Sequence, residues 1–300
     1  MNEISKFGDR RTASGGFRAE MTKTMVPGGV VMRKLEPRDI PSALELSAQA
    51  GWNQTAEDWR TLVDLSVKGC LGIEVDGELA STTTLLSYGK RLAWIGMVLT
   101  RICCRGRGFA RRLLMQALRL ADEMHIETVK LDATEQGQPL YEKLGFRCEQ
   151  SVERWWRPAA GGVVCERVVD YEISEHPWRA ADLRAFGADR TELLEHLARR
   201  NQPLTLGSSY LFSRPGRVSS YLGPCVSEAP ETTRALMERA LETHVEGGWS
   251  WDLLRENAQA VALAHTLGFT PKRHLTRMVR GKDQRGNEQA IYAIAGFELG

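Results

Sequence analysis

Residues 94–121, WIGMVLTRICCRGRGFARRLLMQALRLA, join an apolar run to a loop rich in arginine and glycine, and that loop to a second apolar run. The first run is typical of a buried strand. From Ala110 onward, apolar side chains recur at positions i, i+3, i+4, i+7, i+8 and i+11, which predicts an amphipathic helix that begins at about Gly108. The sequence therefore predicts a strand, a glycine-rich loop and a helix in direct succession.

The predicted loop is suited to binding a phosphate group. Backbone N–H groups in the first turn of a helix have no acceptor within that helix, so they can bind an anion. Gly106 and Gly108 allow backbone conformations and a close approach that a Cβ atom would block. Arg105 adds a positive charge beside them.

Two other interpretations of the loop are weaker. A nucleic-acid surface needs basic residues that continue along one face, but Asp122 and Glu123 follow in the helix and the net charge of the chain is only +2. A thiol or metal site at Cys103 and Cys104 needs a third ligand, and none is near in sequence. We therefore expect neither a nucleic-acid partner nor a metal site.

The flanking sequence predicts an α/β fold. Residues 30–49 read as a strand and a helix, a second helix lies near 57–67, and residues 69–100 read as three antiparallel strands with turns at Asp76-Gly77 and Gly89-Lys90. Residues 127–134 form a strand that follows a helix, so we expect it to be parallel to strand 94–100. A short helix within 137–146 and a last strand at 147–157 complete a mixed, mainly antiparallel sheet flanked by helices.

The second half of the chain repeats this order faintly. After a candidate linker at 159–162 come a strand near 168–173, helices to about 200, a hairpin within 209–223, a helix and a strand near 249–253. The tripeptide LGF occurs at 144–146 and again at 267–269, each time after a short helix. We expect two tandem domains of one α/β type, residues 29–160 and 161–300, after a disordered N-terminal extension, residues 1–28.

The loop and the region around LGF resemble the two signatures of one enzyme superfamily. Arg105-x-x-Gly108-x-Ala110 resembles the loop with which GNAT acyltransferases hold the pyrophosphate of acetyl-CoA, and LYEKLGF at residues 140–146 resembles their second signature. The longer strings GWNQTAEDW, WIGMVL and KLDATEQGQPLYEKLGF are similar to a bacterial subgroup of tandem GNAT proteins. One departure is Ile102, which stands where the loop of the family has a proline.

The resemblance implies an N-acetyltransferase that uses acetyl-CoA as cosubstrate and acetylates a primary amine of a small-molecule acceptor by direct attack in a ternary complex. It implies that Tyr141 is the general acid beside the departing sulfur. The implied cosubstrate site consists of strand 94–100 and the loop, with Met97, Val98, Leu99, Arg105, Gly106, Arg107, Gly108, Phe109 and Ala110. Two alternatives stay open: Tyr141 as a core aromatic, and a non-catalytic protein that senses acyl-CoA or scaffolds a partner.

The acceptor site is less well defined by the sequence. Trp52, Asn53 and Gln54 lie between the first two predicted helices, where GNAT proteins wall the acceptor pocket, and their aromatic and amide groups suit an amphipathic small molecule. Asn53 as a helix cap and the nearby Trp59 as a core residue are the structural alternatives. An attacking amine must lose a proton, and Asp132 and Glu74 are candidate bases.

The second half departs from the family pattern at both signatures. Ala264 aligns with Tyr141, and Glu228 and Glu231 stand at the helix start where the first half has glycine and arginine. Two carboxylates at that position would compete with a pyrophosphate. We expect a degenerate GNAT-like domain that completes the acceptor pocket or the domain interface.

The amino-acid composition indicates the cellular location that we expect for the protein. The cysteine pattern is neither a disulfide scaffold nor a zinc site, so a cytoplasmic location is the simplest expectation. No apolar run approaches the length of about 20 residues that a membrane span needs, so we expect no membrane partner. Monomer and homodimer both remain open.

Overall fold

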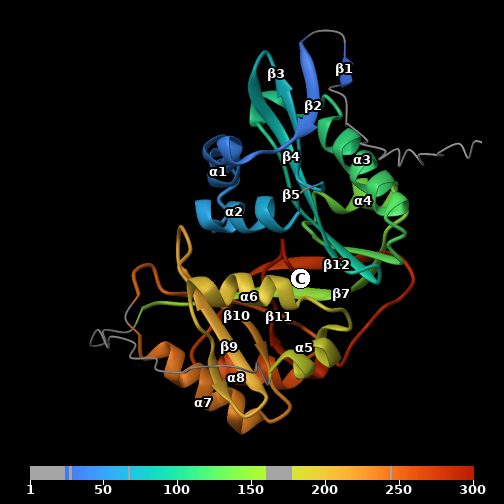
Figure 1. Ribbon diagram of the computed structural model, residues 1–300. Coiled ribbons are helices and arrows are strands. Elements are labelled where there is room, and N and C mark those ends of the chain that lie inside the picture. The colour runs from blue at the N-terminus through green and yellow to red at the C-terminus, as the bar shows by residue number, and fades with distance from the viewer. Residues whose placement is uncertain (1–23, 27–28, 67, 160–177, 244) are drawn as a thin grey trace, which may run out of the picture.

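The computed structural model describes residues 24–26, 29–66, 68–159, 178–243 and 245–300 (Figure 1). The elements of the first half are β1 (Thr24–Val26), β2 (Val30–Lys34), α1 (Ile40–Gln49), α2 (Ala56–Leu65), β3 (Leu71–Val75), β4 (Glu78–Tyr88), β5 (Leu92–Thr100), α3 (Phe109–Glu123), β6 (Thr128–Ala133), α4 (Gln138–Glu142) and β7 (Arg147–Arg157). Those of the second half are α5 (Trp178–Phe186), α6 (Thr191–Arg200), β8 (Leu204–Leu206), β9 (Ser209–Arg214), β10 (Ser220–Val226), α7 (Pro230–Leu241), β11 (Trp249–Leu254), α8 (Ala258–Thr266), β12 (Thr270–Gly281) and β13 (Ile291–Ala293).

The described strands form one continuous sheet. Its order is β1-β2-β3-β4-β5-β6-β12-β7-β11-β10-β9-β8, and β13 pairs with β10 off this path. Within the described residues, β5–β6 and β10–β11 are the parallel pairs and every other pair is antiparallel. This confirms the predicted mixed, mainly antiparallel sheet and the predicted parallel pair in the first half.

The two halves of the chain exchange strands at the centre of this sheet. Strand β12 of the second half lies between β6 and β7 of the first half and pairs antiparallel with both. Strand β7 in turn pairs with β11. Figure 1 shows the red β12 beside the light green β7 at the junction of the two halves. The sheet of each half is therefore completed by a strand of the other.

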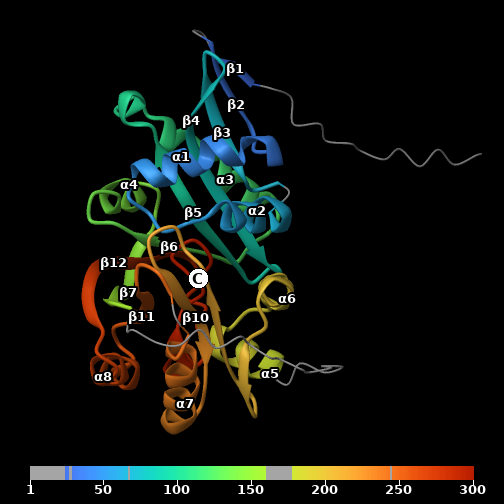
Figure 2. The same ribbon diagram turned by 90° about the vertical axis from the view of Figure 1, so that its left-hand side faces the viewer.

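Helices cover both faces of the sheet in the first half. Helices α1 and α2 pack on one face and α3 on the other (Figures 1 and 2). The buried side of α3 is the stripe that the sequence predicts, and it consists of Leu113, Leu114, Ala117, Leu118 and Ala121, with Leu120 beside it. A capping box starts α2, since Thr55 Oγ1 accepts from Asp58 N at 3.2 Å and Asp58 Oδ2 accepts from Thr55 N at 2.8 Å. Trp59 is fully buried, which confirms the core interpretation of that residue.

Some expectations about chain segments need correction or lie outside the described residues. Residues 24–26 form β1, which pairs with β2, so the expected disordered extension is wrong for these three residues. The expected strand near 168–173, the linker residues 160–162 and the other residues of the N-terminal extension up to 23, with 27 and 28, lie outside the described residues. Among the helices that are described, none is long and apolar enough to cross a membrane.

A buried ion pair joins the exchanged strand to the first half. Arg277 of β12 donates from Nε to Asp132 Oδ1 at 2.9 Å and from Nη2 to Oδ2 at 3.0 Å. The two side chains are 4% and 0% exposed, and the guanidinium also stacks 4.5 Å above the Trp94 ring. Burial raises the pKa of Asp132, while Arg277 acts against that shift. Each charge therefore depends on the other for its place in the sheet.

Arg277→Met should lower the free energy of unfolding by about 3–5 kcal/mol, because it leaves the buried Asp132 carboxylate without its partner. The double variant Arg277→Met with Asp132→Leu removes both charges and should recover a large part of that loss. Urea denaturation of the three proteins measures the difference. A single variant as stable as the parent protein would show that the ion pair does not stabilise the junction.

Candidate active site

Strands β5 and β6 separate at the centre of the first half. Their parallel ladder runs from the pair Leu92 and Thr128 to the pair Trp94 and Lys130 and then ends. Just beyond, Met97 has a left-handed backbone with φ of 48°, and the pairing of β5 with β4 shifts register at this position. Thr82 Oγ1 donates to Met97 O at 2.8 Å and holds this bulge. Among the described residues, the edge of β5 beyond Trp94 therefore has no strand partner on the β6 side.

A cavity opens where the two strands separate, with about 590 Å³ of empty space that is partly open to solvent. It is lined by residues of β5, β6, β7 and β12, by Tyr141 of α4, by the loop between α1 and α2, and by the C-terminal segment. The lining residues are Trp52, Gln54, Ile95, Gly96, Met97, Val98, Leu131, Asp132, Thr134, Tyr141, Arg154, Arg273, Leu275, Phe297 and Glu298. Its mostly apolar wall with a few polar groups is typical of a small-molecule site.

The glycine-rich loop follows β5 and leads into α3. Gly106 and Gly108 have φ of 76° and 75°, a region that side chains with a Cβ atom rarely adopt, and a Cβ at either would meet no protein atom within 4 Å. The first helical hydrogen bond is Arg112 N to Gly108 O at 3.1 Å, so the N–H groups of residues 109–111 precede it. The loop is thus an open, exposed helix start that fits a phosphate group.

Tyr141 both packs in the core and faces the cavity. Its side chain is 8% exposed and its ring meets Phe146 edge to face, with centroids 6.1 Å apart. Its hydroxyl has no hydrogen-bond partner among the described residues, so it is available to a ligand. Burial raises the pKa of the Tyr141 phenol, which keeps the hydroxyl protonated at neutral pH.

The C-terminal residues form part of the cavity wall. Trp94 Nε1 donates to Phe297 O at 2.9 Å, and the Tyr88 hydroxyl donates to Leu299 O. Gly96 permits this contact, because a Cβ there would lie 2.8 Å from the Cα of Glu298. The C-terminus accordingly lies near the middle of the molecule (Figures 1 and 2). Glu298 reaches the site although some 200 residues separate it from β5.

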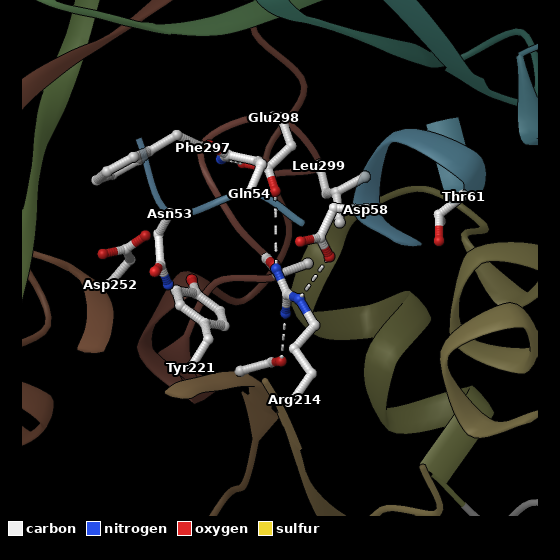
Figure 3. A network of polar contacts seen from close by, with 12 residues as sticks. Asn53, Gln54, Asp58, Thr61, Arg214, Tyr221, Asp252, Phe297, Glu298 and Leu299 are labelled. Carbon is white, nitrogen blue, oxygen red and sulfur yellow. Dashed lines mark hydrogen bonds and ion pairs between the residues drawn. The ribbon is translucent and has the colours of Figure 1, made fainter. Parts of the chain in front are cut away.

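Glu298 is a buried carboxylate at the edge of the cavity, 4% exposed. Gln54 Nε2 donates to Glu298 Oε2 at 2.8 Å, and Arg214 Nη2 lies 3.7 Å from Oε1. Figure 3 shows Arg214 between Glu298 and Asp58 of α2. Burial raises the pKa of Glu298, and Arg214 offsets part of that shift. The Gln54 Oε1 atom is also buried and has no hydrogen-bond partner among the described residues.

Two models of one protein family match the chain. One, described as the acetyltransferase (GNAT) family, matches residues 38–146, and the other, described as an acetyltransferase (GNAT) domain, matches residues 179–293. Together the two segments make up most of the chain. The chain belongs to the GNAT acetyltransferases.

Relatives of known sequence or structure agree with this assignment. YitH of Bacillus subtilis, an uncharacterised N-acetyltransferase, is 28% identical over 219 residues, which are 69% of this chain and 76% of YitH. A putative acetyltransferase from Pyrococcus horikoshii superposes with a TM-score of 0.78 at 21% identity, over 94% of this chain and 100% of that one. A tandem GNAT protein from the clavulanic acid biosynthesis pathway gives a TM-score of 0.59 at 16% identity, over 84% of this chain and 98% of that one. The predicted fold of two tandem GNAT domains is confirmed.

The predicted GNAT site residues fall into two groups. Met97, Val98, Tyr141, Trp52 and Gln54 line the cavity, and the loop residues Arg105, Gly106, Arg107, Gly108, Phe109 and Ala110 lie at the start of α3. Leu99 lies buried on β5 outside the cavity lining. Four further lining residues come from distant segments and carry no local motif in the sequence that would point to them: Arg154, Arg273, Phe297 and Glu298.

Asn53 and the two candidate bases have other partners. Asn53 Oδ1 accepts from Val218 N at 2.8 Å and Ser219 N at 3.1 Å, and its Nδ2 donates to Ser219 O at 2.9 Å. This side chain therefore holds the β9–β10 turn rather than lining the cavity beside β5, and it does not cap α2, since Thr55 does. Glu74 pairs with Arg33 outside the cavity lining, and Asp132 pairs with Arg277. Neither carboxylate is left free to act as a base.

The second GNAT domain repeats the separation of two parallel strands but fills the gap. The ladder of β10 and β11 runs from Ser220 and Trp249 to Leu222 and Trp251. Beyond it, β13 pairs antiparallel with β10, and Ile294 N donates to the Asp252 carbonyl of β11 at 3.0 Å. A segment of the protein itself thus occupies the position that stays open beside β5.

Gly96→Ala tests the seating of the C-terminal residues in the cavity wall. The added methyl group would collide with the backbone of Glu298, so we expect a loss of about 1–3 kcal/mol in the free energy of unfolding and faster digestion by carboxypeptidase. Ser87→Ala on the adjacent β4 serves as a control with no expected effect. Unchanged stability and digestion in Gly96→Ala would contradict the described packing.

Proposed function

We propose that this protein is an N-acetyltransferase that transfers the acetyl group of acetyl-CoA to a primary amine of a small-molecule acceptor. The observation that carries the proposal is the cavity between β5 and β6, which Tyr141 lines and in whose wall the Tyr141 hydroxyl has no hydrogen-bond partner among the described residues. A cavity and an available proton donor are what a transferase needs. A protein that only senses acyl-CoA would need the cavity but not the proton donor, and a scaffold would need neither.

The free edge of β5 and the loop before α3 fit the two ends of the cosubstrate. Backbone groups of Met97 and Val98 would hold the pantetheine arm as an added strand and polarise the thioester carbonyl. The N–H groups at the start of α3 would take the pyrophosphate, and Arg105 and Arg107 are exposed beside it. Acetyl-CoA supplies the activated acetyl group in this site.

The chemistry follows from the groups that line the cavity. No cysteine lines it in the described part of the chain, which supports direct attack by the amine over an acyl-enzyme. The amine nitrogen forms a bond to the acetyl carbon, the carbon–sulfur bond breaks, and Tyr141 donates a hydrogen bond to the departing sulfur. Full proton transfer from an ordinary phenol to a thiolate is uphill by roughly 2 kcal/mol, and burial of Tyr141 increases this difference. A hydrogen bond therefore suffices for the role.

The second GNAT domain serves, in this proposal, as a structural partner of the first. β13 occupies the gap beside β10, Ala264 is buried where the first domain has Tyr141, and Glu231 lies in the first turn of α7. These features disfavour acyl-CoA there. The domain instead supplies Arg273, Leu275, Phe297 and Glu298 to the cavity of the first.

Gly108→Glu should abolish binding of acetyl-CoA, because it places a carboxylate and a large side chain at the start of α3. Gly268→Glu is the matched control, since Gly268 is also exposed, has φ of 78° and has no atom within 4 Å of an added Cβ. Isothermal titration calorimetry with acetyl-CoA compares the two. Equal affinity in both variants would remove the loop from the cosubstrate site.

Tyr141→Phe should lower kcat for thiol release by about 100-fold and change acetyl-CoA affinity little, because the ring still packs against Phe146. Tyr292→Phe removes a hydroxyl in the second domain and should keep parental turnover. A panel of primary amines with a thiol-detecting reagent provides the assay. Parental kcat in Tyr141→Phe would exclude this residue from the chemical step.

A further inference from the structure

One of the two arginines that line the cavity has no ion-pair partner within the described part of the chain. Arg154 makes a bidentate pair with Asp252, at 2.7 and 2.6 Å, and lies 4.7 Å above the Phe297 ring. Arg273 of β12 has neither a hydrogen bond nor an ion pair to any described residue, and its guanidinium lies 5.9 Å from the centroid of the Trp52 ring. The cavity thus contains a guanidinium whose five N–H donors have no acceptor among the residues that the structure describes, so they are available to a ligand.

The surroundings of Arg273 make this charge costly to leave unpaired. Its side chain is half-buried, and burial together with the nearby Arg154 lowers the pKa of Arg273. The negative charge of Asp252 raises the pKa of Arg273 and so opposes this shift. Both carboxylate oxygens of Asp252, however, already accept hydrogen bonds from Arg154. An anionic group of a ligand would relieve this unfavourable charge, and a carboxylate matches the planar fork of a guanidinium.

A complementary acidic group lies in the same cavity. Two carboxylates line the cavity, Asp132 and Glu298. Arg277 binds Asp132 with two hydrogen bonds, whereas the nearest nitrogen of Arg214 lies 3.7 Å from Glu298, so Glu298 has no bidentate arginine partner. Beside it, Gln54 Oε1 is buried without a donor. A ligand ammonium group would supply the missing donor to Gln54 and a charge to Glu298. Trp52 and Phe297 offer apolar walls between the basic and acidic groups.

We propose that the acceptor is an amino acid-type molecule, a small primary amine that carries a carboxylate, which Arg273 binds while Glu298 and Gln54 receive the amine. This inference rests on the proposed acetyl transfer. The ammonium gives one proton to the Glu298 carboxylate, and the neutral nitrogen then bonds to the acetyl carbon as the carbon–sulfur bond breaks. The nitrogen loses its second proton to the departing thiolate, and Glu298 returns its proton to solvent, so the products are the N-acetylated acid, CoA thiol and one proton.

The test compares proteinogenic amino acids that carry a primary amine with the corresponding amines that lack the α-carboxylate. Phenylalanine is compared with phenethylamine, for example, and alanine with ethylamine. Thiol release gives kcat and KM, and calorimetry on the CoA-loaded protein gives binding without turnover. For the best pair we expect the amino acid to exceed its decarboxylated amine by about 10- to 100-fold in kcat/KM, the worth of a charge-assisted hydrogen-bonded pair.

Three variants assign the effect to residues. Arg273→Gln should raise KM for the amino acid by about 10- to 100-fold and leave the decarboxylated amine unchanged. Lys272→Gln is the matched control, because Lys272 is the exposed neighbouring cation on β12 and lies 5.2 Å from the Trp156 ring instead. Glu298→Gln should lower kcat for both members of a pair alike, since both carry the amine.

The outcomes separate this inference from the proposed function. Equal kcat/KM for amino acids and decarboxylated amines, or an equal effect of Arg273→Gln on both, overturns the carboxylate site while the transferase stands. Binding of amino acids that depends on Arg273, with no thiol release from any amine, supports the carboxylate site and overturns the transferase. Absence of binding and of turnover for every amino acid overturns the inference as well.

Discussion

The insertion of β12 between β6 and β7 is the constraint on which the rest of the structure depends. Its backbone pairs with both neighbours, and the buried Arg277–Asp132 pair ties its centre to β6. Because side chains alternate along a strand, Arg273 and Leu275 share the face of Arg277 and reach the cavity of the first domain. One strand of the second domain therefore completes the sheet of the first domain and brings an arginine to its site.

The C-terminal segment that follows extends the same arrangement. β13 fills the gap beside β10, and the next residues continue into the wall of the other cavity, where Glu298 lies against Gly96. The same separation of parallel strands thus becomes a closed structural feature in one domain and an open site in the other. Repetition of a fold does not by itself repeat a site, because a site requires space that the chain leaves unfilled.

Much of the fold and about half of the candidate site could be predicted from the sequence. The period of the apolar residues in α3, the turns at Asp76-Gly77 and Gly89-Lys90 and the loop glycines are local signals, and the elements appear where these signals place them. Asn53 shows the limit of such reasoning. Its position between two helices matched an acceptor wall, yet its amide binds the backbone of a turn 165 residues away.

The sequence by itself determined most of the secondary structure and the glycine-rich start of α3, because each depends on residues within one turn, strand or helix, and the repeated order of these elements indicated the tandem arrangement. Only the tertiary structure decided which domain completes which sheet, which carboxylates are already paired and which charged groups face the cavity. These features depend on contacts between segments far apart in the chain. No periodicity shows that Asp132 is bound by Arg277 or that Glu298 lies beside β5, since burial and charge pairing arise only when the strands meet.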